Sequence, residues 1–128
     1  MTEPIFLTLE QVEDLHRRAL ELHGGQDGVR DPSALESAVI HPRNVLYYAQ
    51  GDIFDVAAAY AFHLAESQAF LDGNKRVGIA AALVFLRTNG VTVSRATGEL
   101  YSSMIAIAER RMGKPELAAL LRTLGKST

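Results

Sequence analysis

The chain has 128 residues with a formal net charge of −2, is 48% hydrophobic and 22% charged, and contains neither cysteine nor tryptophan. This length and composition predict one globular domain over residues 1–128. The lack of cysteine excludes disulfides, thiol catalysis and cysteine-bound metals, and the slight negative charge argues against direct binding of nucleic acid. The first residues do not resemble a leader and no apolar stretch reaches membrane-spanning length, so we expect a cytoplasmic protein with no membrane partner.

The first predicted helix begins after Thr8, which has Gln11 three residues later in the pattern of a capping box. Its apolar stripe consists of Val12, Leu15, Ala19 and Leu22. The glycine pair at Gly24 predicts its end. His16 and His23 are seven residues apart on this helix; without a third ligand nearby in the sequence, they favour a packing or solvated role over a metal site.

The second predicted helix begins after Asp31, an N-cap residue that is followed by proline. We expect it to end near His41, because Pro42 blocks further extension. Residues 43–51 show no periodicity, and the apolar and aromatic run at 45–48 predicts a hairpin or a flap. Two interpretations of this stretch stay open, a flap that docks a target and a simple cover for the core.

Two strongly apolar helices follow. Asp52 can cap the first, which includes residues 56–66 and is apolar on nearly every side. The second includes residues 77–86, is rich in alanine, and ends at Asn89 with a glycine after it. These patterns predict two buried helices that pack closely against each other.

The remaining chain predicts smaller elements. Residues 91–93 alternate like a short edge strand, with residues 5–7 as a possible pairing partner. A helix from Thr97 is expected to stop at Gly113, and a last helix opens at Lys114 before a proline. With six helices and at most minor strands, the predicted fold class is all-α.

Residues 70–76 read Phe-Leu-Asp-Gly-Asn-Lys-Arg and lie between the two apolar helices. A helix N-terminus offers unpaired N–H groups and a partial positive charge, and a glycine there lets the backbone approach an anion. Lys75, Arg76, Asp72 and Asn74 add two cations, a carboxylate and an amide. Such a set suits a polyphosphate with its divalent metal. The alternative is an ordinary turn with surface charge, although two basic residues in a first turn oppose the helix dipole.

With this motif the chain resembles the Doc branch of the Fic/Doc family, whose signature is His-x-Phe-x-Asp/Asn-Gly/Ala-Asn-Lys-Arg between two buried helices. The resemblance extends over nearly the whole chain, through residues 7–12, 24–32 and 83–90. It implies an all-helical fold that binds ATP with Mg²⁺ and modifies a hydroxyl group of a target protein.

The resemblance also implies a role for each motif residue. Asp72 would hold the metal, Gly73 and Asn74 would present the anion-binding loop, and Phe70 would lock the loop into the core. Arg76 would contact phosphates.

Lys75 would contact phosphates as well and marks the Doc type, because Fic proteins with glycine at this position typically transfer AMP. The Doc type resembles Fic enzymes in fold but transfers the terminal phosphate to a threonine of elongation factor Tu and so stops translation. A bulky cation in place of glycine gives a physical reason for a different nucleotide pose.

One residue departs from the signature: Gln68 stands where the family has its histidine. That histidine is the general base, and glutamine has no usable pKa near neutrality; loss of a general base typically costs on the order of 10²–10⁴ in rate. His63 is not an evident substitute, because five residues earlier on a helix it points roughly 140° away. Three explanations stay open: an introduced substitution, a naturally degenerate member, and a phosphoryl transfer that tolerates the loss.

The leading functional hypothesis is therefore a toxin of a type II toxin–antitoxin system, a Doc-type protein kinase that Gln68 impairs. The resemblance implies two partners, elongation factor Tu as the target and a Phd-type antitoxin whose C-terminal segment folds onto the toxin. The alternatives are a Fic-type AMP transferase and a catalytically dead member that binds nucleotide or antitoxin.

Overall fold

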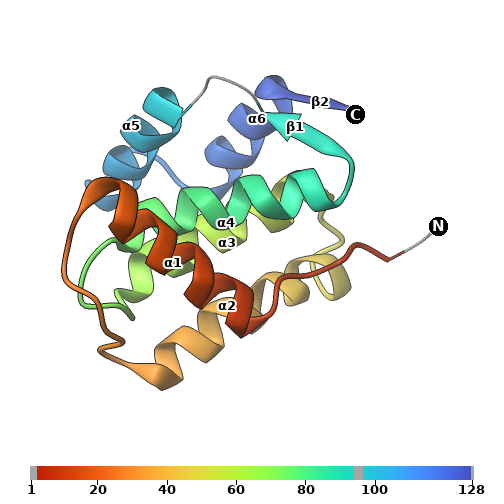
Figure 1. Ribbon diagram of the computed structural model, residues 1–128. Coiled ribbons are helices and arrows are strands. Elements are labelled where there is room, and N and C mark those ends of the chain that lie inside the picture. Colours follow the sequence, from red (N-terminus) through yellow and green to blue (C-terminus); the bar gives the residue numbers. More distant parts are fainter. Residues whose placement is uncertain (1–2, 94–96, 128) are drawn as a thin grey trace.

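The computed structural model describes residues 3–93 and 97–127. In these residues it has six helices and one two-stranded sheet (Figure 1). The elements are α1 (Leu9–His23), α2 (Pro32–Tyr47), α3 (Ile53–Ser67), α4 (Asn74–Thr88), β1 (Val91–Val93), α5 (Thr97–Ala108), α6 (Lys114–Leu124) and β2 (Gly125–Ser127). The all-α prediction is confirmed. No helix among the described residues is long and apolar enough to cross a membrane.

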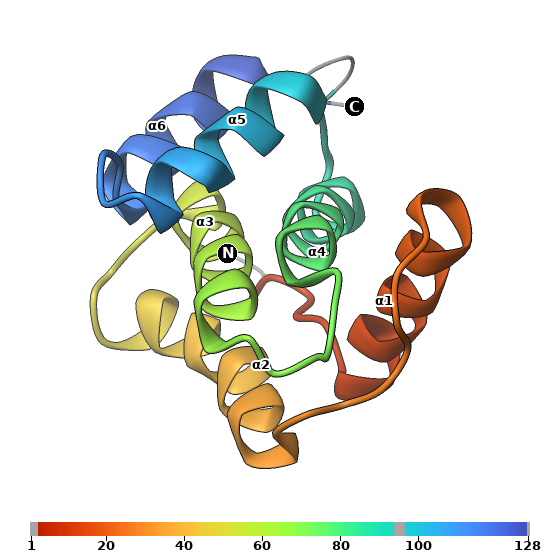
Figure 2. The ribbon, with the colours of Figure 1, turned by 90° about the vertical axis from the view of Figure 1, so that its left-hand side faces the viewer.

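Helices α3 and α4 lie side by side in the middle of the molecule. Figure 2 looks nearly along both, with α5 and α6 on one side and α1 and α2 on the others. Their contact is close because of Gly78: a Cβ atom there would lie 2.7 Å from the carbonyl oxygen of Ala61. The predicted pair of buried, closely packed helices is confirmed, and it fixes the loop that joins them.

The N-terminus of α3 is stabilised by a capping carboxylate, Asp52, that also forms an ion pair. Asp52 caps the helix and accepts hydrogen bonds from the backbone N–H groups of Phe54 and Asp55 and from the guanidinium of Arg122 in α6. Burial alone would raise the pKa of Asp52, but these hydrogen bonds outweigh it and leave the pKa lowered. The ion pair joins the first turn of the central helix to the last turn of α6.

The predicted helix starts are confirmed where caps were expected. Thr8 and Gln11 form a reciprocal capping box, and the Asp31 carboxylate accepts from the N–H of Ala34. Helix α1 ends at Gly24, which adopts a φ of 78°.

The end predicted for the second helix was wrong. Helix α2 continues through Pro42 to Tyr47, so residues 43–47 are helical and form neither a hairpin nor a flap. Pro42 cannot donate its backbone hydrogen bond. Its ring is buried, however, and this packing offsets the missing bond. Tyr47 packs against Phe6, while Tyr48 is 84% exposed.

The predicted pairing of residues 91–93 with residues 5–7 was also wrong. Strand β1 pairs antiparallel with β2, Val91 opposite Ser127. The Asn89 side chain instead accepts from the N–H of Ile5 and donates to its carbonyl oxygen, so these N-terminal groups need no strand partner.

Gly113 does not end α5, which stops at Ala108. The chain reverses through Arg110, with a φ of 64°, and Gly113 is the N-cap of α6.

Candidate functional site

The loop between α3 and α4 is held from inside by the side chain of Asn74. Its Oδ1 accepts from the N–H of Phe70 at 3.1 Å, and its Nδ2 donates to the Phe70 carbonyl at 3.0 Å. The Phe70 side chain is buried, as the locking role predicted for it requires. Asn74 thus shapes the loop and does not point its amide group at a ligand.

Helix α4 begins without a side-chain cap. Its N-cap, Gly73, has a φ of 77° and no side chain. In the described part of the chain, the N–H groups of Asn74, Lys75 and Arg76 have no hydrogen-bond partner. Unpaired amides at the positive end of a helix form an anion-binding site.

Asp72 stands at the edge of this helix start. Its Oδ1 accepts from the N–H of Gly73 at 2.8 Å, and its Oδ2 lies 3.3 Å from the N–H of Gln26. The carboxylate is exposed and carries no ion pair within the described residues, so it is accessible to a cation.

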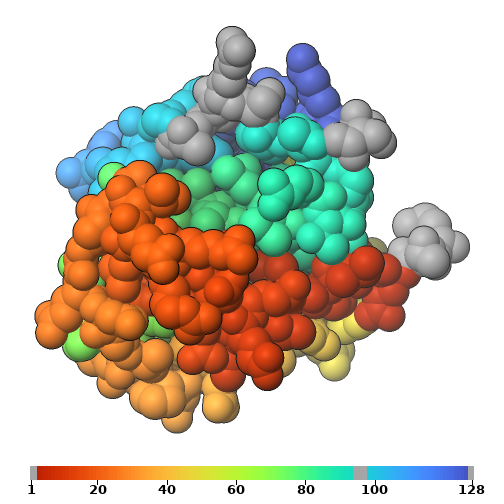
Figure 3. Space-filling view, viewed as in Figure 1, coloured from red at the N-terminus to blue at the C-terminus, as the bar shows by residue number. Residues whose placement is uncertain are grey.

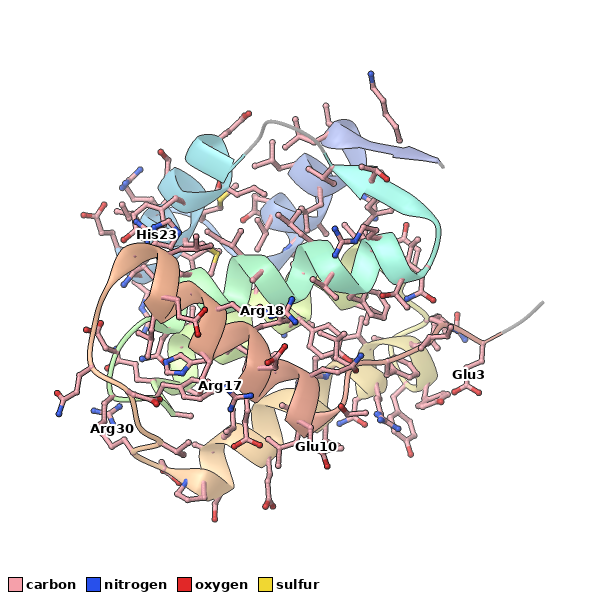
Figure 4. All side chains as sticks on the ribbon, viewed as in Figure 1. Glu3, Glu10, Arg17, Arg18, His23 and Arg30 are labelled. Carbon is pink, nitrogen blue, oxygen red and sulfur yellow. The ribbon has the colours of Figure 1, made fainter. Side chains whose placement is uncertain are left out.

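These groups surround one open cavity of about 430 Å³. Its lining residues come from the end of α1, the end of α3, the loop, the start of α4 and α5. They are His23, Gly24, Gly25, Ala65, Gln68, Leu71, Asp72, Gly73, Asn74, Lys75, Arg76 and Tyr101. Figure 4 shows His23 at the end of α1 that lies next to α5. Six of the seven residues predicted for the site therefore line one cavity, and Phe70 supports it from the core.

The two cations of the motif differ in how they are held. The guanidinium of Arg76 lies 4.7 Å from the ring centroid of Tyr101 in α5, a cation–π contact. Lys75 makes neither an ion pair nor a hydrogen bond within residues 3–93 and 97–127. Its ammonium group is free to meet an anion, whereas Arg76 is already oriented by an aromatic surface.

Gln68 follows α3 in a left-handed conformation, with φ 47° and ψ 41°. Its carbonyl oxygen accepts a hydrogen bond from Nη2 of Arg30, a residue that Figure 4 places on the segment after α1. The side chain is exposed and lines the cavity, at the place where the signature predicts the general base.

His63 lies elsewhere. It lines a separate cavity of about 190 Å³, with its ring 4.1 Å from that of His41 and its Nε2 accepting from Nζ of Lys114 at 3.1 Å. Burial, Lys114 and His41 lower the pKa of His63 to about 4. It cannot supply the proton acceptor that Gln68 lacks.

The segment between α1 and α2 packs along the loop, a feature that the sequence analysis missed. Val29 bridges Phe70, with the N–H of Arg30 bonded to the Ala69 carbonyl at 2.7 Å and the N–H of Leu71 bonded to the Gly28 carbonyl at 3.0 Å. This segment, rather than residues 43–51, lies against the motif.

Glycine makes the approach of this segment possible. A Cβ atom on Gly25, with a φ of 123°, would lie 2.9 Å from Oδ2 of Asp72. A Cβ atom on Gly28 would lie 2.8 Å from Cδ1 of Leu71. The sequence analysis gave Gly25 a role only in ending the first helix, and it included Gly28 only in the resemblance over residues 24–32.

His16 has the packing role that the sequence analysis left open for it, and it packs against the motif loop. It is 2% exposed, its Nε2 lies 2.7 Å from the carbonyl oxygen of Asp72, and its ring stacks on Phe70 with centroids 3.7 Å apart. His23 lines the cavity instead, so the two histidines have different environments. Among the described residues no group of three or more metal-binding side chains forms.

A second hollow lies beside the first. An apolar groove of about 560 Å³ runs between α1, α4 and α5. Leu15, Leu22, Ile79 and Leu83 are among its lining residues, and Arg18, His23, Arg76 and Tyr101 line it as well. In Figure 3, part of α4 is visible between α1 and α5. Arg76, Tyr101 and His23 also line the first cavity, so the two hollows are adjacent.

Comparison with known proteins identifies the same family that the motif resembles. A sequence model described as the Fic/DOC family matches residues 6–86. "Protein kinase doc" of Escherichia phage P1 is 35% identical over 115 residues, which cover 80% of this chain and 91% of that protein. "Toxin Doc" of Mycolicibacterium smegmatis is 42% identical over 73 residues, which cover 56% of each chain.

Proposed function

Because the chain belongs to the Fic/Doc family, we propose that it is the toxin of a toxin–antitoxin pair and that its site is built to transfer the γ-phosphate of ATP to a protein hydroxyl. Two relatives bear Doc names, one of them as a protein kinase and the other as a toxin. The proposed acceptor is a threonine of elongation factor Tu.

The observation that carries the proposal is the uncapped start of α4. The unpaired amides of residues 74–76, the free Lys75 ammonium and the oriented Arg76 guanidinium meet in one cavity. Together they offer charge neutralisation for a polyphosphate.

The site also fits a magnesium ion. Mg²⁺ is commonly held by one or two carboxylates together with substrate phosphates, and the exposed Asp72 carboxylate lines the cavity beside the amides. When bound, the ion would neutralise charge on the phosphates. Asp72 is the residue that would hold it.

In the proposed reaction the acceptor oxygen forms a bond to the γ-phosphorus, the bond to the bridging oxygen of ADP breaks so that ADP leaves, and the hydroxyl proton is released to water in the open cavity. Lys75, Arg76 and the amides stabilise the charge on the transferring group. The Gln68 side chain can accept a hydrogen bond from the hydroxyl and hold it in place, but it cannot take its proton. We therefore propose that activity is impaired by about 10²–10⁴ relative to a protein with histidine at this position.

The test is transfer of label from γ-labelled and α-labelled ATP to purified elongation factor Tu, with this chain and its Gln68→His variant side by side. We expect label from the γ position only, and far more with the variant. Label from the α position would instead show an AMP transferase. If neither protein transfers label, the kinase proposal is wrong.

Gln68 itself favours a second candidate, a member that binds nucleotide or antitoxin without turnover. This candidate predicts binding of Mg-ATP by both proteins and transfer by neither. Calorimetric titration of both with Mg-ATP, run beside the label assay, separates the two functions.

We propose that the apolar groove receives the antitoxin, a Phd-type protein. Leucine and isoleucine side chains line it and suit the apolar face of a helix, while Arg18, His23 and Arg76 favour acidic residues along that helix. Leu22 is 79% exposed, so Leu22→Glu should leave the fold intact and weaken antitoxin binding at least tenfold. Tyr48→Glu, at a site 84% exposed and outside the groove, is the matched control. Equal binding by both variants would remove the groove from the proposal.

The proposed target protein has a different docking surface, on the segment between α1 and α2. Leu71, which lines the cavity, is 47% exposed, and Val29, in the segment packed along the loop, is 39% exposed. Because the bridge to Phe70 uses the neighbouring amides, the N–H and C=O groups of Val29 point away from the loop and have no partner in the described chain. We propose that an extended target segment pairs there. Val29→Glu, at a residue that does not line the cavity, should then lower transfer to the protein target and leave Mg-ATP affinity unchanged; equal loss of both would contradict this.

A further inference from the structure

His16 is one of two buried polar residues in the described chain, the other being Ser103. A buried imidazole is costly unless its nitrogens find partners. A carbonyl oxygen can only accept, so the 2.7 Å contact with the Asp72 carbonyl fixes the proton of His16 on Nε2. The second nitrogen, Nδ1, lies 3.9 Å from the carboxylate of Asp27. The Nε2 hydrogen bond therefore joins α1 to the loop.

This hydrogen bond sets the orientation of one peptide. The peptide between Asp72 and Gly73 is planar, and in the trans form its C=O and N–H groups point in opposite directions. The structure has no cis peptide among its described residues. Because His16 draws the Asp72 carbonyl toward α1, the N–H of Gly73 points the opposite way, and Oδ1 of Asp72 accepts it at 2.8 Å.

Two further contacts resist rotation of the loop around this peptide. The His16 ring lies nearly parallel to the Phe70 ring, at 9° and a centroid distance of 3.7 Å. Gly73 passes over the same imidazole, 3.5 Å from Nε2 at the position that a Cβ atom would occupy. One side chain thus contacts the loop at Phe70, Asp72 and Gly73.

We propose that His16 is a positioning residue for the nucleotide site. Through the Asp72 carbonyl it holds both the residue whose carboxylate would bind the metal and Gly73, the N-cap from which the anion-binding helix start follows. The inference rests on the proposed function for its nucleotide readout, but the orientation of the peptide can be measured without nucleotide.

Three variants separate the hydrogen bond from packing. His16→Phe keeps a ring that can stack on Phe70 and removes the donor. His16→Gln loses the ring and places an amide nitrogen that can still donate to the Asp72 carbonyl. Val12→Ala lies one turn earlier on α1 at a fully buried position and lowers stability without touching the loop.

The first measurement is NMR-detected hydrogen exchange in protein without nucleotide, read at the amides of Leu71 and Gly73. We expect exchange about tenfold faster or more in His16→Phe than in Val12→Ala, and close to the parent protein in His16→Gln. Equal exchange in His16→Phe and Val12→Ala would overturn the proposal.

The second measurement is calorimetric titration of the same proteins with Mg-ATP. Removal of a residue that orients a metal ligand typically lowers affinity 10–100-fold. We therefore expect His16→Phe to bind Mg-ATP at least about tenfold more weakly than the parent protein, and Val12→Ala to bind it with nearly the parent affinity. Equal affinity in the parent, His16→Phe and Val12→Ala proteins would refute the positioning role. If the parent protein binds no Mg-ATP while the exchange rates differ as expected, His16 still orients the loop and the proposed function fails.

Discussion

The two hydrogen bonds between the Asn74 side-chain amide and the Phe70 backbone, here called the amide clamp, give the sharpest prediction about stability. Asn74→Ala removes two hydrogen bonds, to the N–H and to the C=O of Phe70. Phe70 is 2% exposed, so water cannot easily replace them. Each buried group left without a partner costs about 1–3 kcal/mol, and we expect a loss of about 2–4 kcal/mol in the free energy of unfolding.

The matched control is Asn89→Ala. Asn89 also brackets a backbone, accepting from the N–H of Ile5 and donating to its carbonyl, but Ile5 is 62% exposed. Water can replace those bonds, so we expect a cost of about 1 kcal/mol. Urea unfolding should show both losses as shifts of the midpoint at constant m-value. If Asn74→Ala costs no more than Asn89→Ala, the clamp does not hold the loop in the way described.

Three further predictions follow. Gly78→Ala should destabilise by about 1–3 kcal/mol in urea unfolding despite the better helix propensity of alanine, because its Cβ would lie 2.7 Å from the Ala61 carbonyl oxygen. Gly25→Ala should displace the Asp72 carboxylate, 2.9 Å from the new Cβ, and weaken Mg-ATP binding about tenfold in calorimetry. Because the pKa of His63 falls from 6.5 to about 4 on folding, the unfolded chain binds more protons between these values; urea unfolding at stepped pH should show about 1–2 kcal/mol of stability lost as the pH falls through this window, after allowance for solvent screening.

Each of these three has a control. Gly98→Ala lies in α5 with nothing within 4 Å of its Cβ and should not destabilise. Gly90→Ala also has open surroundings, lies outside the cavity lining and should leave Mg-ATP affinity unchanged although its φ of 91° adds strain. His63→Gln should flatten the pH dependence. A Gly78→Ala protein as stable as its parent, unchanged Mg-ATP affinity in Gly25→Ala, or an unchanged pH slope in His63→Gln would each contradict the corresponding reasoning.

The sequence predicted those parts of the fold that local chemistry decides. Caps such as Thr8 and Asp31 act within three residues, and the helices around the motif are long, nearly continuous apolar runs, so both were placed correctly. Pro42 misled the analysis because its local penalty is offset by tertiary burial, which no window of sequence displays. The partner of β1 was missed because a three-residue strand carries almost no pairing information.

In the site as well, contacts between neighbours in sequence were predicted, and contacts between distant segments were not. Residues next to one another in the motif were predicted to share an anion site, and the structure brings them to one cavity. His16 and Gly25 come from more than forty residues away, and their importance depends on the approach of α1 to the loop. The sequence alone could not separate the inward His16 from the cavity-lining His23, because seven residues on a helix place both on nearly the same face.

The most direct test of the account is a titration of ¹⁵N-labelled protein with Mg-ATP, followed by NMR. The account predicts saturable shifts concentrated on the amides of Asn74, Lys75 and Arg76, with affinity reduced about tenfold or more in Lys75→Ala. Shifts confined to the apolar groove, or none at all, would contradict the claim that the uncapped start of α4 is a nucleotide site.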